Sequence, residues 1–190
     1  MIDRFIDIST FLLSAIGIIL EIKQIKLFWI LYIIASILFI YEFTMIHLFA
    51  SSALQIIYII LSIYGWIKWS EKSKNSNTIK IRYATNKERV IYIILTIIIS
   101  IVFNFIFAKF EANSSLLDSS IAAVCIIATY MSTLKQIESF LIFALTVCFS
   151  VPLYLKNNLY FTAASFLIFG ILDLIGFIQW RSIYKISNKS

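Results

Sequence analysis

Residues 54–69 read LQIIYIILSIYGWIKW, an apolar run that ends in a glycine and two tryptophans. A second apolar run ends in nearly the same way, because residues 175–180 read IGFIQW where residues 64–69, 111 positions earlier, read YGWIKW. A lysine follows each motif five positions later, at Lys74 and Lys185. About 20 mostly apolar residues allow a helix to cross a bilayer, where it satisfies its own backbone hydrogen bonds. Both runs are therefore predicted to be membrane-spanning helices.

The composition indicates the same solvent for the whole chain. Hydrophobic residues make up 61% of the 190 residues, charged residues only 14%, and the mean hydropathy is +0.94. Soluble domains are about 45–50% apolar and about 25% charged. We predict an all-α integral membrane protein with seven transmembrane helices, at about residues 5–20, 27–44, 48–69, 88–107, 116–134, 138–155 and 159–179.

Basic residues are distributed unequally between the two sides that seven spans define. Of the 16 lysines and arginines, three lie on the side of the N-terminus and thirteen on the other side. Cytoplasmic loops carry the excess of positive charge in membrane proteins. We therefore expect the N-terminus outside and the tail 181–190 in the cytoplasm. The basic loop 70–89 is interpreted as a determinant of this orientation, and no nucleic-acid partner is expected.

The chain contains an internal repeat. At an offset of 111 residues the identities include Asp7 with Asp118, Ala53 with Ala164, Leu61 with Leu172, Gly65 with Gly176 and Trp69 with Trp180. At an offset of 112, KQIKLFWI (23–30) aligns with KQIESFLI (135–142). We therefore expect a slip of one residue between segments of the repeat, as a loop insertion would produce.

The repeat predicts a 3+1+3 arrangement. Three-helix bundles would occupy residues 1–69 and 111–180, and residues 70–110 would supply the basic loop and a linker helix at about 88–107. Because three is odd, the extra helix restores the orientation of the second copy. The result is a pair of parallel repeats related by an axis along the membrane normal, as in SWEET sugar carriers. Transporters of this kind bind substrate near the midplane, at the interface between the repeats.

Polar and aromatic side chains form a stripe on each closing helix of the repeat. In one helix the stripe is Gln55, Ser62, Trp66 and Trp69, and in the other it is Phe166, Asp173, Phe177 and Trp180. The symmetry is lost where Gln55 corresponds to Phe166 and Ser62 to Asp173. An asymmetric ligand needs such differences, and polar groups at membrane depth are functional candidates. We predict a cavity walled by aromatic residues in which Gln55 and Asp173 orient the ligand.

Several of these residues also have a structural interpretation. Gln55 can hydrogen-bond to a neighbouring helix, and Asp173 can pair with a polar group such as Asn104. Tryptophans at the membrane interface anchor helices without any ligand, which would account for Trp69 and Trp180.

Enzyme chemistry is not predicted. The chain has one histidine, and it lacks a Gly-x-x-x-x-Gly-Lys loop, a Cys–His cluster and paired carboxylates on a polar helix face. We expect no cofactor and no metal site. A chain without a nucleotide-binding loop is not by itself an ATP-driven pump. A transporter is the favoured class, and a non-transporting membrane sensor or scaffold is the alternative.

These features resemble the PnuC family of bacterial vitamin transporters. The resemblance rests on the 3+1+3 pattern, on LQIIYIILSIYGWIKW (54–69), on the pair Asp118-Ser119, and on PLYLKNNLYFTAASFLIFGILDLIGFIQW (152–180). It implies a multi-pass transporter of the bacterial inner membrane that carries nicotinamide riboside, while relatives carry thiamine or riboflavin. It also implies facilitated diffusion that a cytoplasmic vitamin kinase makes one-way, and a homotrimer in the lipid bilayer.

The resemblance implies substrate-binding roles most directly for Gln55, Trp69, Asp118 and Trp180. Asp118 opens a predicted helix, so its carboxylate also suits a helix cap. Where the family has Glu-Asn-Trp-x-x-Trp, this chain reads ESFLIF (138–143), which puts Phe140 in the place of a tryptophan. The face of Trp stacks better than that of Phe on flat or cationic rings. Because of this departure from the family, thiamine remains an alternative substrate to nicotinamide riboside. The predicted substrate-binding set is Gln55, Ser62, Trp66, Trp69, Asp118, Phe140, Asp173, Phe177 and Trp180.

Overall fold

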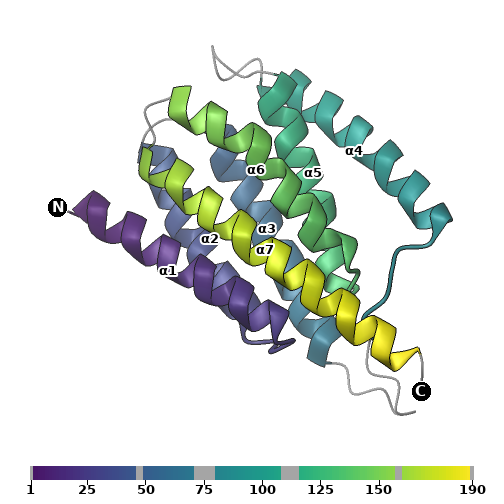
Figure 1. The fold of residues 1–190 in the computed structure, drawn as a ribbon. Helices are drawn as coiled ribbons and strands as arrows, with labels where there is room; N and C mark the ends of the chain where they lie inside the picture. Colours follow the sequence, from purple (N-terminus) through teal and green to yellow (C-terminus); the bar gives the residue numbers. More distant parts are fainter. Residues whose placement is uncertain (1, 46–48, 71–79, 108–115, 157–159, 189–190) are drawn as a thin grey trace.

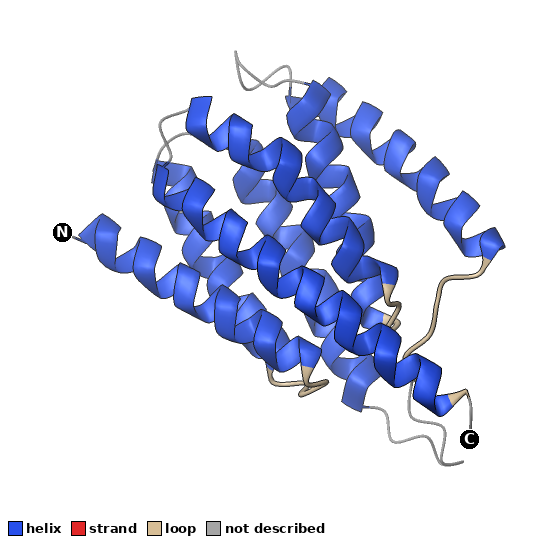
Figure 2. Cartoon of the chain, viewed as in Figure 1, coloured by secondary structure: helices blue, strands red, loops and turns tan. Residues whose placement is uncertain are grey.

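The computed structural model describes residues 2–45, 49–70, 80–107, 116–156 and 160–188, which fold into seven helices without a strand (Figures 1 and 2). In chain order these are α1 (Ile2–Ile22), α2 (Phe28–Met45), α3 (Phe49–Ser70), α4 (Asn86–Phe107), α5 (Leu116–Thr133), α6 (Glu138–Lys156) and α7 (Tyr160–Ser187). The prediction of an all-α chain with seven helices is confirmed.

The last helix is longer than predicted. α7 continues to Ser187 instead of ending near residue 179, so most of the predicted tail 181–190 is helical. Neither glycine nor proline follows Trp180 within the helix, and Tyr184 packs edge-on against Tyr83 with the ring centroids 5.1 Å apart. The helix therefore continues past its apolar part because nothing breaks it and a tertiary contact holds it.

The outer surface of the bundle is apolar. Three helices contain described stretches that are long and apolar enough to cross a membrane, namely Ser52–Ser70, Asn86–Ile106 and Tyr160–Ser187. The described apolar stretches of the other four helices are shorter. Large side chains face outward along the bundle, such as Ile60 at 61% and Phe105 at 66% exposure. A soluble protein rarely exposes apolar surface on this scale, so a bilayer is the solvent that it fits.

Contacts between the helices follow a regular order (Figure 1). α1 packs on α2 and α2 on α3, while α5 packs on α6 and α6 on α7. Two further contacts join these sets, α1 with α7 and α3 with α5, and α4 lies at the edge of the bundle against α5. A shift of 111 residues along the chain exchanges α1 with α5, α2 with α6 and α3 with α7. Each of the six contacts that do not involve α4 then becomes another of these six contacts. The helix boundaries recur at the same offset, in the pairs Ile22 and Thr133, Met45 and Lys156, and Phe49 and Tyr160.

The turns that follow α1 and α5 have the same backbone conformation. Gln24 (φ 58°) and Lys135 (φ 51°) are the described non-glycine residues with positive φ. Gln24 N donates to Glu21 O at 2.8 Å, and Lys135 N donates to Ser132 O at 3.0 Å. The equivalent of Gln24 is therefore Lys135 and not Gln136, so the predicted slip to an offset of 112 is wrong. The backbone keeps the 111-residue register because the hydrogen bonds, and not the Lys-Gln-Ile identity, determine which residue adopts the left-handed conformation.

Candidate functional site

Trp69 and Trp180 cap two helices at one end of the bundle. The Nε1 atom of Trp69, on α3, donates to Thr133 O at the end of α5 over 3.2 Å. The Nε1 atom of Trp180, on α7, donates to Ile22 O at the end of α1 over 3.0 Å. The last carbonyls of a helix have no partner within the helix, so each indole satisfies one of them. Trp180 is 0% exposed, and therefore it does not act as a lipid-facing anchor.

Three pairs of residues meet their own counterparts in the repeat, and we call them the counterpart pairs: Trp69 with Trp180, Gln24 with Lys135, and Glu21 with Ser132. The tryptophan rings lie 6.2 Å apart between centroids. The lysine Nζ donates to the glutamine Oε1 over 3.1 Å, and the serine Oγ donates to the glutamate Oε1. Two equivalent residues can touch only close to the line about which the two copies are related.

The glycines of the two motifs lie under aromatic rings. Trp29, on α2, covers Gly65, and Phe140, on α6, covers Gly176 at the equivalent position. A Cβ atom on Gly176 would lie 2.7 Å from Phe140 ring atoms, and one on Gly65 would overlap the Trp29 indole. A close-packed interior does not absorb such overlaps without a shift. Phe140 is itself 1% exposed and packs edge-on against Trp180 with the centroids 4.9 Å apart.

Glu21 is a buried acidic residue that sequence reasoning missed. Its side chain accepts hydrogen bonds from Tyr32 Oη over 3.0 Å and from Ser132 Oγ, and the residue is 3% exposed. A charged residue that directly follows an apolar run is normally interpreted as the end of the span. The repeat contained a signal that could have found it, because Glu21 aligns with Ser132 just as Asp173 aligns with Ser62.

Asp173 and Ser62 occupy equivalent buried positions two helical turns from the capping tryptophans. Asp173 is 6% exposed and Ser62 is 1% exposed. Ser62 Oγ has no hydrogen-bond partner among the described residues. Asp173 forms no hydrogen bond or ion pair with any described residue, and so the predicted alternative of pairing with Asn104 is not seen. The described groups within electrostatic range of the Asp173 carboxyl include Glu21, Tyr32 and Cys125.

Two further residues of the predicted substrate-binding set lie on α3 and α7 close to those already described. Gln55 is 8% exposed and lies two turns beyond Ser62 on the same face of α3. Phe177 is half-buried and packs against the apolar cluster that contains Trp180 and Phe140. Gln55 thus lies on the face of α3 that carries Trp69, and Phe177 lies beside Trp180 on α7.

The other two predicted residues are not part of this group. Trp66 is half-buried, and Lys26 Nζ lies 4.9 Å from its ring centroid and donates to Ser70 Oγ over 3.2 Å, at an exposed position. Trp66 therefore faces the end of the bundle. The side chain of Asp118 lies outside the part of the chain that the structure describes.

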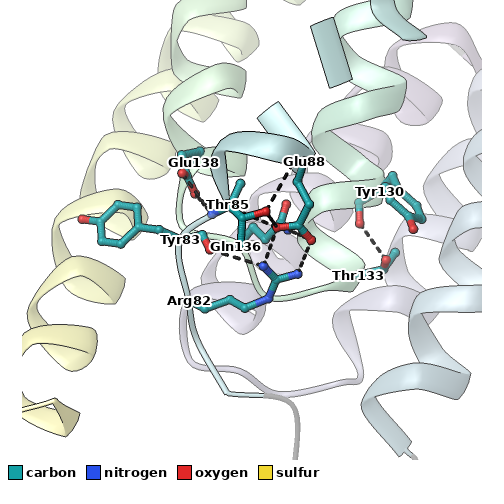
Figure 3. Close-up of polar contacts among 9 residues, drawn as sticks. Arg82, Tyr83, Thr85, Glu88, Tyr130, Thr133, Gln136 and Glu138 are labelled. Carbon is teal, nitrogen blue, oxygen red and sulfur yellow. Dashed lines mark hydrogen bonds and ion pairs between the residues drawn. The ribbon is translucent and has the colours of Figure 1, made fainter. Parts of the chain in front are cut away.

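Residues 80–85, which we call the strap, bind the turn between α5 and α6 (Figure 3). Arg82 N donates to Lys135 O over 3.1 Å, and Arg82 O accepts a second backbone hydrogen bond from the same turn over 3.0 Å. Ala84 N donates to both carboxylate oxygens of Glu138, each over 3.1 Å. The strap also places Ile81 in the apolar cluster around the tryptophans, so it closes this end of the bundle.

Charged side chains fasten the strap to α4 (Figure 3). Arg82 Nη1 and Nη2 donate to the two carboxylate oxygens of Glu88, each over 2.7 Å. Thr85 N donates to Glu88 Oε2 over 2.8 Å and Glu88 N donates to Thr85 Oγ1 over 3.3 Å, which is a capping box at the start of the helix. The hydrogen bonds to Glu88 raise the pKa of the Arg82 guanidinium. The predicted basic loop thus contains an ordered element in addition to its positive charge.

A small cavity lies between α1, α2 and α7, away from the strap. It measures about 20 Å³, which is enough for about one water molecule. Its lining contains Phe166, the repeat counterpart of Gln55, and none of the nine predicted substrate-binding residues. The remaining lining residues are Thr10, Phe11, Phe39, Phe161, Thr162, Ser165 and Phe169.

The fold and these buried groups define a class of protein. Apolar helices surround acidic, amide and hydroxyl side chains that lie too deep to serve solubility, as is typical of multi-pass membrane transporters. The chain belongs to the nicotinamide mononucleotide transporter family, whose model matches residues 4–182. The resemblance to the PnuC family is thereby confirmed, and with it the expectation of a transporter instead of an enzyme.

Individual relatives agree with this assignment. The chain is 24% identical to the nicotinamide riboside transporter PnuC of Escherichia coli, over 73% of this chain and 69% of that protein. It is 25% identical to the riboflavin/roseoflavin transporter RibM of Streptomyces davaonensis, over 70% of this chain and 65% of that protein. The crystal structure of the vitamin B3 transporter PnuC has the same fold, with a TM-score of 0.76 at 15% identity, over 96% of this chain and 83% of that chain.

Proposed function

We propose that this protein is a uniporter that imports nicotinamide riboside across the bacterial inner membrane by facilitated diffusion. The name of the Escherichia coli relative supports this substrate. The observation that carries the proposal is the reciprocal capping by Trp69 and Trp180, because it relates two matched sets of helices around a buried polar interior. Two such sets can rock against each other, as alternating access requires. Phosphorylation of the vitamin by a cytoplasmic kinase would make the uptake one-way.

The proposed architecture is 3+1+3. Residues 1–69 and 111–180 would form parallel three-helix bundles related by a pseudo-twofold axis, and residues 70–110 would link them through α4. The recurrence of helix ends at 111 residues, the paired contacts of α1 with α7 and of α3 with α5, and the counterpart pairs all support this arrangement. Because the strap and its basic residues lie at the end where α1 and α5 terminate, we place that end in the cytoplasm and the N-terminus outside.

The proposed binding site lies between the two bundles. In it, aromatic side chains stack on the nicotinamide ring and polar groups hydrogen-bond to the ribose, with Gln55 as the first candidate for the ribose contact. The burial of Gln55 on the face of α3 that also carries Ser62 and Trp69 supports this assignment. The full set is that predicted from the sequence: Gln55, Ser62, Trp66, Trp69, Asp118, Phe140, Asp173, Phe177 and Trp180.

A homotrimer is the proposed assembly. α4 packs against α5 and exposes most of its apolar surface, including Ile93 (61%) and Phe105 (66%), which suits contact with lipid or with a neighbouring subunit. Native mass spectrometry of the protein released from nanodiscs would measure the subunit number, and a monomer would contradict this part of the proposal.

Uptake by proteoliposomes tests the function. Labelled nicotinamide riboside should enter vesicles that contain the protein and equilibrate without an ion gradient or ATP. Gln55→Ala and Trp69→Ala, reconstituted to the same density, should slow uptake by about tenfold or more, since each removes a contact to the ligand. Wild-type rates in both variants would show that the binding site is assigned to the wrong residues.

Thiamine is the second candidate substrate. The observation that favours it is Phe140, which lies edge-on against Trp180 where the family has a tryptophan. A thermal-shift screen with nicotinamide riboside, thiamine and riboflavin would rank the three ligands, and the largest stabilisation should identify the substrate.

A further inference from the structure

Asp173 is a buried acidic residue in the middle of α7 without a partner among the described residues. It is 6% exposed, and no described residue donates a hydrogen bond to it or forms an ion pair with it. A buried carboxylate is normally paired or neutralised, because its charge is poorly solvated away from water. The group that would satisfy Asp173 is therefore absent from the described side chains.

A second buried group faces the same place. Ser62 is 1% exposed, and its Oγ has no partner among the described residues. Seven residues correspond to two helical turns, so Ser62 lies above Trp69 and Asp173 lies above Trp180 on nearly the same faces. Because the two tryptophan rings meet at 6.2 Å, both faces are directed toward the line between α3 and α7. Ser62 and Asp173 thus lie on the sides of α3 and α7 that are directed toward each other, and we take the region between them as the candidate site.

Two carboxyl groups lie at this candidate site. The Glu21 carboxyl lies within electrostatic range of Asp173, and Tyr32 donates its hydroxyl to Glu21. Lys135, in the turn after α5, is engaged elsewhere, since its Nζ lies 4.4 Å from the Trp69 ring centroid and donates to Gln24. Two acidic groups that have no basic partner among the described residues favour a positive ligand, and aromatic faces add to that preference.

We propose that Asp173 is the counter-ion for a positively charged heteroaromatic ring, with Ser62 hydrogen-bonding to the same ligand, so that the site selects cationic over neutral vitamins. This inference rests on the proposed function, of which it specifies the substrate class. Nicotinamide riboside carries a quaternary pyridinium nitrogen and thiamine a quaternary thiazolium nitrogen, whereas the ring system of riboflavin is neutral. Asp173 would then be the residue that distinguishes this chain's substrate from a flavin.

The test compares two ligands that differ mainly in charge. Dihydronicotinamide riboside has the same substituents as nicotinamide riboside but a neutral, reduced ring. In proteoliposomes of the full chain, after subtraction of uptake by protein-free vesicles, we expect the cationic form to enter about tenfold faster or more. Asp173→Asn should reduce this ratio to about one, and Asp173→Glu, which keeps the charge, should retain part of it.

A matched control tests whether the loss of any buried hydroxyl group affects uptake. Ser150, on α6, is also 1% exposed with an unpartnered Oγ among the described residues, but it is not on the stripe of α3 or α7. Ser150→Ala should leave uptake and preference unchanged, whereas Ser62→Ala should slow uptake of both forms and keep the preference for the cation. Equal entry of the two forms into wild-type vesicles, or an unchanged ratio in Asp173→Asn, would overturn the inference and leave the proposed uniport intact.

Failure of the proposed substrate gives a different result. If neither nicotinamide form enters wild-type vesicles, the proposed substrate is wrong, and thiamine and riboflavin then test the charge rule by thermal shift. Stabilisation by thiamine that Asp173→Asn abolishes would support it. Stabilisation by riboflavin that is equal or larger would overturn it.

Discussion

Trp69 and Trp180 stand 111 residues apart in the chain and 6.2 Å apart between ring centroids, and each donates its indole N–H to the last turn of a helix from the other set. Trp69 belongs to α3 and caps α5, while Trp180 belongs to α7 and caps α1. The same two residues that end the matching motifs therefore connect α3 to α5 and α7 to α1.

Replacing one capping indole should weaken the fold. Trp180→Phe removes the donor to Ile22 O but keeps an aromatic ring, and we expect the free energy of unfolding to fall by about 1–3 kcal/mol, because a buried carbonyl loses its partner. Trp69→Phe should cost a similar amount, since Thr133 is 0% exposed and its carbonyl likewise loses its donor. Unfolding in mixed micelles, followed by circular dichroism, measures both changes. A wild-type free energy of unfolding in either variant would contradict the capping role of that indole.

Neither glycine of the motifs should tolerate a methyl group. Gly65→Ala pushes against the Trp29 indole and Gly176→Ala against the Phe140 ring, and overpacking of this kind typically costs about 1–3 kcal/mol. A smaller neighbour should relieve the strain, so Trp29→Leu is expected to rescue part of the stability of Gly65→Ala. The melting temperatures of the single and double variants form a double-mutant cycle. Strictly additive losses would show that the ring and the glycine do not interact.

The strap should protect its own backbone amides from exchange with solvent. Arg82 N and Ala84 N donate to Lys135 O and Glu138, so both amides should exchange slowly in hydrogen–deuterium exchange measured by mass spectrometry. Glu138→Gln weakens a charge-assisted acceptor and should speed exchange at Ala84 more than at Arg82. The matched variant Arg82→Lys, which cannot make the bidentate contact with Glu88, should loosen the start of α4. Fast exchange at both amides in the wild-type protein would argue against a bound strap.

Stability should also change with pH through one lysine of the α5–α6 turn. Burial lowers the pKa of Lys135 from its ordinary value of 10.5. The unfolded chain therefore binds more protons than the folded one between the lowered pKa and 10.5, and so the free energy of unfolding should rise with pH across that window. Lys135→Met keeps the apolar stem and should remove this increase. Melting temperatures at a series of pH values from about 8 to about 10.5 would measure it, and parallel curves for the two proteins would contradict it.

The helices and the repeat could be predicted because each depends on information carried within a short window. Continuous apolar length predicts the seven helices, and the recurrence of Gly65 and Trp69 at Gly176 and Trp180 predicts the repeat. The strap could not be predicted, since its binding depends on backbone hydrogen bonds between Arg82 and a turn some 50 residues later, which no side-chain pattern records.

The polar interior was predicted only in part. Asp173, Ser62 and Gln55 interrupt apolar runs, and hydropathy therefore marks them as unusual. Glu21 lies at the end of a run, where an acid is ordinary in sequence, and its burial arises only because α2 and α5 place Tyr32 and Ser132 around it. Depth in the assembled bundle, and not local composition, distinguishes such a residue.

The counterpart pairs bear on how such a chain can have arisen. In a symmetric dimer of a single three-helix unit, Glu21 would face a second Glu21, and two like charges would meet on the axis. Duplication followed by fusion frees each side to change independently, and here the acid faces Ser132 while Gln24 faces Lys135. A single polypeptide can thus hold an acid on one side of its axis and a hydroxyl on the other, which two identical chains cannot do.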